Sequence, residues 1–244
     1  MIKLGKNDVV VFLGDSITDG SRFRNMDCNN IFGHGYAEMI CSRLGADNCE
    51  NAPKFVNKGI SGESSSQIYA RLGRDCLQYK PTFINILAGV NDAGDLSLGF
   101  TEEMVVRNYL ENLERMVNES RELYPDVKIV ICEPFYKKID YKEDPYNHIP
   151  HPFCEPYFKF ACFEVTEETI ERYDSIVKKM QKELPGLCEK LNVIFVPFQD
   201  IYDKAEEKTH ISYFIWDHIH PTMVGHRLMA DRWLEVVERE LNKY

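Results

Sequence analysis

Short apolar runs alternate with segments of helical period along this chain, and the alternation limits its fold more than any other pattern. Each run is rich in β-branched residues and has the length of a strand. Such runs are typical of strands buried on both faces of a parallel sheet. We therefore predict about five parallel strands, at Asp8–Leu13, Phe83–Leu87, Val127–Cys132, Val193–Val196 and, more weakly, Phe55–Asn57.

The segments between these runs have apolar residues three and four positions apart, which places them on one face of a helix. Two such stripes consist of Val106, Leu110, Leu113 and Val117, and of Ile170, Tyr173, Val177, Met180 and Leu184. We expect the last helix to begin at Pro221, since proline suits the first helical position, and to bury Ala230, Leu234, Val237 and Leu241. The prediction is an α/β fold of three layers, with ligands bound beyond the carboxyl ends of the strands.

No repeat, linker or low-complexity tract divides the chain, so we predict one domain over residues 1–244. The irregular part is residues 137–165, an excursion with four prolines and many aromatic residues. A segment of this length without a regular period suits either a lid over a binding site or an ordered surface excursion that packs on its own aromatics. Exposed aromatics there would also suit self-association, so a homo-oligomer is compatible with the sequence.

Composition limits the partners and the compartment. A net charge of -10 repels a nucleic-acid backbone, and no run of apolar residues is long enough to cross a bilayer or to act as a signal peptide. The eight cysteines include no Cys-x-x-Cys pair, and we expect reduced thiols in a cytoplasmic protein. The alternative is export directed by a signal outside this sequence.

Ser16 is the candidate nucleophile. It lies in the motif Gly-Asp-Ser-Ile-Thr-Asp-Gly, which directly follows the first predicted strand. A serine there emerges at the carboxyl end of the sheet, where its hydroxyl can face the crevice. The alternative is ordinary turn chemistry, in which the hydroxyl bonds to nearby backbone.

A serine hydroxyl needs a base, and the motif Trp-Asp-His-Ile-His-Pro offers one. Asp217 precedes His220 by three residues, so a tight turn can bring the carboxylate to one imidazole nitrogen while the other faces Ser16. His218 is a rival base, although its adjacency to Asp217 makes the contact harder. The alternative is that Asp217 caps the next helix and His220 is a surface imidazole. Neither His34, between two glycines, nor His226, on the last helix, has such a neighbour.

Acyl transfer also needs donors for the developing oxyanion. Gly62 follows the weak strand and could expose its N–H, and Asn91 ends the strand from Phe83 and could present its amide. Gly62 as a simple turn glycine and Asn91 as part of an Asx-turn are the alternatives. The combination of four segments with complementary roles favours catalysis over these separate explanations.

These four segments resemble the blocks of SGNH (GDSL-like) hydrolases, which contribute a serine, a glycine, an asparagine, and a histidine with an aspartate three residues before it. The matches are Ser16 in GDSITDG, Gly62 in NKGISGESS, Asn91 in GVNDA, and Asp217 with His220 in WDHIHP. The resemblance implies a flavodoxin-like sheet and a catalytic triad of Ser16, His220 and Asp217. It also implies an acyl-enzyme mechanism without metal or cofactor, with an oxyanion hole made by the N–H groups of Ser16 and Gly62 and the Asn91 amide.

Within that family the motifs are most similar to bacterial intracellular acetylesterases that act on xylo-oligosaccharides. The expected substrate is therefore a small acyl ester, an acetylated oligosaccharide, with Asp15 and Trp216 as candidates for substrate binding. A lysophospholipase or thioesterase acting on lipids, and a carbohydrate-binding protein without turnover, are the alternatives. His148, His151 and Cys154 have spacings of three residues, but four ligands are usual for structural zinc, and we expect no metal site.

Overall fold

In the computed structural model, five parallel strands form one sheet with the order β2-β1-β3-β4-β5. The structure describes residues 1–24, 28–140, 144 and 166–243. All five predicted strands are confirmed, and the weak one is as long as any other. Their bounds are β1 Val9–Gly14, β2 Lys54–Gly59, β3 Phe83–Leu87, β4 Lys128–Cys132 and β5 Ile194–Val196.

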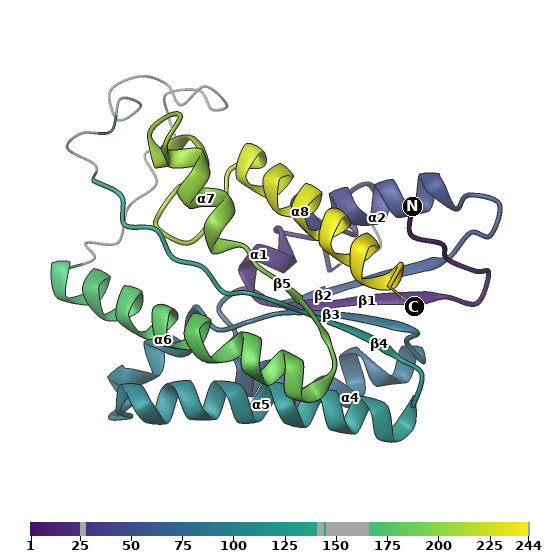
Figure 1. Cartoon of the computed structure of the whole chain (residues 1–244), viewed down its shortest axis with the longest axis horizontal. Coiled ribbons are helices and arrows are strands. Elements are labelled where there is room, and N and C mark those ends of the chain that lie inside the picture. Colours follow the sequence, from purple (N-terminus) through teal and green to yellow (C-terminus); the bar gives the residue numbers. More distant parts are fainter. Residues whose placement is uncertain (25–27, 141–143, 145–165, 244) are drawn as a thin grey trace.

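Helices cover both faces of this sheet, as the alternating pattern predicts (Figure 1). On one face lie α1 (Ser16–Asp19), α2 (Tyr36–Asp47), α7 (Gln199–Glu206) and α8 (Met223–Leu241). The other face carries α3 (Ser65–Ala70), α4 (Leu72–Asp75), α5 (Glu102–Leu123) and α6 (Glu167–Leu191). Short 3-10 helices complete the described elements: η1 Cys28–Asn30, η2 Leu77–Tyr79, η3 Asn91–Leu98 and η4 Ile211–Tyr213.

Successive side chains of the strands enter two separate cores. In β1, Val10 and Phe12 pack under the layer of α2 and α8, whereas Val11 and Leu13 pack under the layer of α5 and α6. All four side chains are at most 1% exposed. A strand buried on both faces has no polar side, which explains why its sequence is a continuous apolar run. The three-layer α/β fold predicted from these runs is confirmed.

The two predicted helical stripes are also confirmed: they face the sheet from α5 and α6 and pack in the second core, except that Ile170 and Val177 pack in a small separate cluster with Val90 and Tyr136. The start of the last helix was predicted wrongly. Pro221 lies before α8 and pairs with Ile215 in an isolated antiparallel bridge. Thr222 is the N-cap, and its side-chain oxygen accepts hydrogen bonds from the N–H groups of Val224 and Gly225. A threonine cap satisfies two free amides, which a proline at that position cannot do.

Most of the predicted excursion at 137–165 lies outside the described residues, so both interpretations of it, a lid and an ordered surface excursion, stay predictions. Residues 137–140 run beside the loop that precedes α8, where the Lys137 N–H donates to the His218 carbonyl at 3.0 Å. No helix among the described residues is both long and apolar enough to span a membrane.

Candidate active site

The carboxyl ends of three adjacent strands meet at one edge of the sheet. Gly14, the last residue of β1, pairs with Gly59 of β2 on one side and with Leu87 of β3 on the other. The chain forms β2 on one side of β1 and β3 on the other, and ligands of open α/β sheets generally bind where the connections diverge in this way. The segments that follow these strands carry Ser16, Gly62 and Asn91, so the sheet brings the three predicted segments together.

Ser16 is the first residue of α1, the short helix that follows β1. Asp15 caps this helix, with its Oδ1 accepting the Ile17 N–H at 3.0 Å. The first N–H groups of a helix have no partner within it, so the Ser16 N–H is free of the helical ladder. The turn is tight: a side chain at Gly14 would come within 2.2 Å of Thr18 Oγ1.

His220 and Asp217 come from the loop between η4 and α8. Ser16 Oγ lies 2.7 Å from His220 Nε2, and His220 Nδ1 lies 2.8 Å from Asp217 Oδ2. The loop is closed by a hydrogen bond from the Trp216 N–H to the His220 carbonyl, at 2.7 Å. Asp217 Oδ1 also accepts the N–H groups of Ile219 and His220. One carboxylate therefore builds the turn and binds the imidazole, whereas the cap of α8 is Thr222, so the alternative role of Asp217 as a helix cap is wrong.

The electrostatics of the pair favour an imidazole that accepts a proton. Burial alone would lower the pKa of His220, but the hydrogen bond to Asp217 and the carboxylate charges of Asp217 and Asp15 raise it above the ordinary value. Burial likewise opposes ionisation of Asp217, yet the contacts with His220 hold its pKa below the usual range. The two shifts agree: the ion pair formed when His220 takes up a proton is stabilised.

The rival base, His218, is directed elsewhere. Its side chain is buried, its ring stacks on Tyr136 with the centroids 5.7 Å apart, and its Nδ1 lies 3.1 Å from both the Ile139 N and the Lys137 O. Burial lowers the pKa of His218. This residue fastens the chain after β4 to the loop and takes no part in the contact with Ser16.

Two of the predicted oxyanion donors lie in a loop after β2 and at the start of η3. Gly62 has φ of +83°, a conformation that favours glycine, although a Cβ there would meet no atom within 4 Å. The backbone angle, and not crowding, therefore explains the glycine. The Asn91 Nδ2 donates to the Glu63 carbonyl at 3.1 Å, which joins the end of β3 to the Gly62 loop.

Two buried aspartates that sequence reasoning did not single out hold these loops. Asp19 Oδ2 accepts both the N–H and the hydroxyl of Ser61, each at 3.0 Å, which ties α1 to the residue before Gly62. Asp92, next to Asn91, accepts the Ser65 N–H at 2.9 Å and also the Ser65 hydroxyl. Asp19 lies within the motif that contains Ser16, and Asp92 follows Asn91, so their positions were a signal. No local sequence pattern, however, distinguishes such a buried aspartate from one on the surface.

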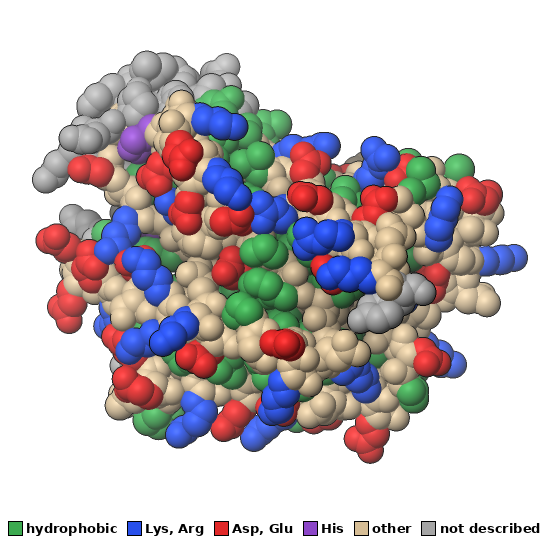
Figure 2. Space-filling model, in the orientation of Figure 1, with side chains coloured by type: hydrophobic (Ala, Val, Ile, Leu, Met, Phe, Trp, Pro, Cys, Tyr) green, Lys and Arg blue, Asp and Glu red, His purple; other side chains and the backbone are tan. Residues whose placement is uncertain are grey.

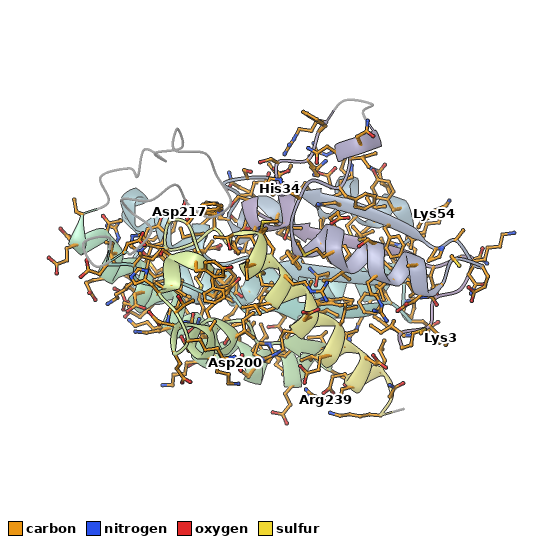
Figure 3. The ribbon with its side chains drawn as sticks, turned by 90° about the horizontal axis from the view of Figure 1, so that it is seen from above. Lys3, His34, Lys54, Asp200, Asp217 and Arg239 are labelled. Atoms are coloured by element: carbon orange, nitrogen blue, oxygen red, sulfur yellow. The ribbon has the colours of Figure 1, made fainter. Side chains whose placement is uncertain are left out.

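The two candidates for substrate binding have different surroundings. Asp15 is only 1% exposed, and its Oδ2 accepts no hydrogen bond from any of the described residues. Burial raises the pKa of Asp15 to about 6, against the lowering effects of the Ile17 N–H and of His220. Trp216 is half-buried beside Asp217. Figure 3 places Asp217 at the opposite end of the molecule from Lys54, the first residue of β2, and so at the carboxyl edge of the sheet.

This arrangement can perform acyl transfer. A hydroxyl bonded to an imidazole that is itself bonded to a carboxylate is an activated nucleophile. The helical N–H of Ser16 and the groups on the neighbouring loops are the kind of donor that stabilises an oxyanion. The candidate zinc ligands His148, His151 and Cys154 lie outside the described residues.

Comparisons with known proteins agree with this chemistry. Residues 10–233 match the model of the family described as GDSL-like lipase/acylhydrolase. An acetylxylan esterase of Geobacillus stearothermophilus is 26% identical over 241 residues, which cover 97% of this chain and 96% of that enzyme. A lipoprotein of Bacillus subtilis strain 168, YqeF, is 27% identical over 183 residues, 74% of this chain and 68% of the relative.

Solved structures are similar over nearly the whole chain. A protein described as a GDSL-like lipase from Parabacteroides merdae has 31% identity and a TM-score of 0.79, with coverage of 97% of this chain and 98% of that one. The Geobacillus acetylxylan esterase has 27% identity and a TM-score of 0.69, covering 97% and 96%. Its catalytic mutants include replacements of a serine, an aspartate and a histidine by alanine.

Proposed function

This chain belongs to the GDSL-like lipase/acylhydrolase family, and on that basis we propose that it is a serine esterase that removes acetyl groups from carbohydrate. The observation that carries the proposal is the unbroken line of contacts from Ser16 Oγ through His220 to Asp217. Ser16 is the nucleophile, His220 the base, and Asp217 the group that orients the imidazole.

The reaction proceeds in two halves. Ser16 Oγ attacks the acetyl carbonyl as His220 Nε2 takes its proton, and the negative oxygen is held by the N–H groups of Ser16 and Gly62 and the Asn91 amide. The C–O bond to the sugar then breaks, and His220 returns the proton to the departing hydroxyl. Water attacks acetyl-Ser16 as His220 takes its proton, the bond from the acyl carbon to Ser16 Oγ breaks, and His220 returns the proton to Ser16 as acetate leaves.

The substrate assignment rests on similarity and on the surroundings of the site. The Geobacillus relative is an acetylxylan esterase aligned over nearly its whole length. Trp216, half-buried and adjacent to Asp217 in the sequence, is the candidate aromatic surface for a sugar ring. Asp15, being buried, supports the site from beneath Ser16 through its cap on α1.

A lipid ester is the second candidate, because the family description includes lipases. It needs the same triad with room for a longer acyl chain. The length of the preferred acyl group therefore distinguishes the two substrate classes, whereas loss of the nucleophile tests the mechanism that they share.

We further propose that the enzyme works in the cytoplasm, where thiols stay reduced. Five cysteines are free, namely Cys41, Cys49, Cys76, Cys132 and Cys188, and all of these except Cys49 are buried. Buried free thiols are compatible with a reducing compartment.

The first experiment is hydrolysis of p-nitrophenyl acetate, butyrate and octanoate and of acetylated xylo-oligosaccharides by wild type and Ser16→Ala. We expect acetyl release to dominate, and turnover to fall roughly 10⁴-fold or more in the variant because the triad acts as a unit. Ser42→Ala, at an exposed serine on α2, is the matched control. Normal turnover by Ser16→Ala would contradict the mechanism, and an octanoate optimum would move the substrate class to lipids.

A further inference from the structure

A buried guanidinium bonds to the segments that carry the candidate oxyanion donors. Arg71, between α3 and α4, is only 5% exposed. Its Nη1 donates to the Lys58 carbonyl at 2.6 Å, its Nη2 to the Gly14 carbonyl at 3.2 Å, and its Nε to Glu63 Oε2 at 2.5 Å. A charge removed from water is costly unless it is paired and hydrogen-bonded, and Arg71 has two carboxylate and two carbonyl partners, with Asp75 as the second carboxylate.

Three of the four contacts of Arg71 lie beside proposed oxyanion donors, and the fourth is with Asp75 on α4, at 3.4 Å. Gly14 is two residues before Ser16, at the end of β1. Lys58 is near the end of β2, from which the loop to Gly62 departs, and Glu63 is the residue after Gly62. One guanidinium therefore joins the strand that bears the nucleophile to both ends of the Gly62 loop.

The third donor is connected through Glu63. The Glu63 carboxylate pairs with Arg71, while its backbone carbonyl accepts one N–H of the Asn91 amide. An amide NH₂ carries two N–H groups. The bond to Glu63 thus fixes the direction of the second Asn91 N–H, which is the one that can serve an oxyanion.

We propose that Arg71, together with Glu63, is a positioning element that holds the three oxyanion donors in register; the proposal rests on the function proposed above. Donors stabilise a transition state only if they are placed before the reaction begins. The planar fork of arginine can bind three acceptors at fixed angles. A lysine ammonium would keep the charge but lose that geometry.

The test measures kcat and KM of Arg71→Lys and Glu63→Gln with p-nitrophenyl acetate. We expect kcat to fall about tenfold or more in Arg71→Lys and about fivefold in Glu63→Gln, as a fraction of the 10²–10³-fold effect of losing one donor. KM should stay within about twofold of wild type, because the donors act on the transition state. Arg43→Lys on α2, an exposed arginine paired with Asp47, should behave as wild type.

A double-mutant cycle separates positioning from general damage. If Glu63 acts partly through the Asn91 amide, Glu63→Gln should lower kcat less in an Asn91→Ala background than in wild type. The Glu63 side chain is partly accessible, at 18% exposed. The Glu63→Gln measurements therefore test the proposed positioning role even if Arg71→Lys does not fold. Unchanged kcat in Glu63→Gln, or an equal effect in both backgrounds, overturns the inference. An inactive wild type would instead refute the proposed esterase function.

Discussion

Burial shifts the pKa values of two ionisable side chains near His220 in opposite directions. His226 is 6% exposed, and its Nδ1 accepts the Tyr36 N–H at 3.2 Å. Burial lowers its pKa to about 3, helped by the charges of His34 and His220. Burial raises the pKa of Asp15 to about 6. Near pH 5 both groups are therefore neutral in the folded protein, whereas both are charged in the unfolded chain.

These shifts predict how stability depends on pH. The unfolded chain holds a proton on His226 that the folded protein lacks, so this residue destabilises the fold as pH falls below about 6.5. Asp15 has the opposite effect between about pH 6 and pH 4, because there the folded protein holds the extra proton. The contributions of His226 and Asp15 to the pH dependence of the unfolding free energy therefore largely cancel.

Asp15→Asn removes the contribution of Asp15 to the pH dependence of stability, while keeping a side-chain oxygen that can cap α1. Its unfolding free energy should therefore fall about 1 kcal/mol more per pH unit than that of wild type on acidification from pH 5.5 to 4.5. Urea denaturation at several pH values measures both slopes. Parallel slopes would mean that Asp15 titrates alike in the folded and unfolded states.

The decisive element is the loop that leads from η4 into α8. It places His220 opposite Ser16, and its end is fixed by Thr222, which is fully buried. The Thr222 hydroxyl donates to the Tyr213 carbonyl at 2.8 Å while accepting the first N–H groups of α8. One hydroxyl thus ties the two ends of the loop to the helix.

Thr222→Ala should lower stability by about 1–2 kcal/mol, the usual cost of a lost N-cap. It should also lower kcat, because His220 is only two residues before the cap. Thr222→Ser, which keeps the hydroxyl, is the matched variant and should restore most of both. Thermal unfolding and ester hydrolysis measure the two effects, and a serine variant as impaired as the alanine variant would argue against capping.

At the scale of the whole molecule, a polar cluster crosses the core between the sheet and its helices. Asn85 of β3 is fully buried; its Nδ2 donates to the Tyr36 hydroxyl of α2, and its Oδ1 accepts the Trp233 indole N–H of α8 at 2.7 Å. The Tyr36 hydroxyl lies 2.9 Å from Thr18 Oγ1, in the turn that bears Ser16. The outer surface mixes charges of both signs, as Figure 2 shows on one face.

Asn85→Leu should therefore destabilise the protein by about 2–4 kcal/mol, because it leaves the Trp233 N–H buried without its acceptor and removes a donor to Tyr36. The matched control is Asn118→Leu, at an exposed position of α5, with an expected change within about 0.5 kcal/mol. Chemical denaturation of both variants tests the difference. Similar small losses would show that the cluster contributes little to stability.

The sequence alone determined the strands and the identities of the triad candidates. A strand buried on both faces must be apolar throughout, and a nucleophile, a base and its carboxylate must be particular residue types at particular spacings. The helices at 36–47 and 199–206 were not predicted. In the first, Gly45 and the two glycines before the helix weaken the local signal.

Tertiary structure alone decided which distant groups meet. The order of the strands places the ends of β1, β2 and β3 side by side, and Ser16 meets His220 across 204 positions of sequence. It also decided that Asp19, Arg71 and Asp92 are buried and bonded to the loops of the site. The local sequence does not show whether a charged side chain is buried or exposed, because its burial depends on residues far away along the chain.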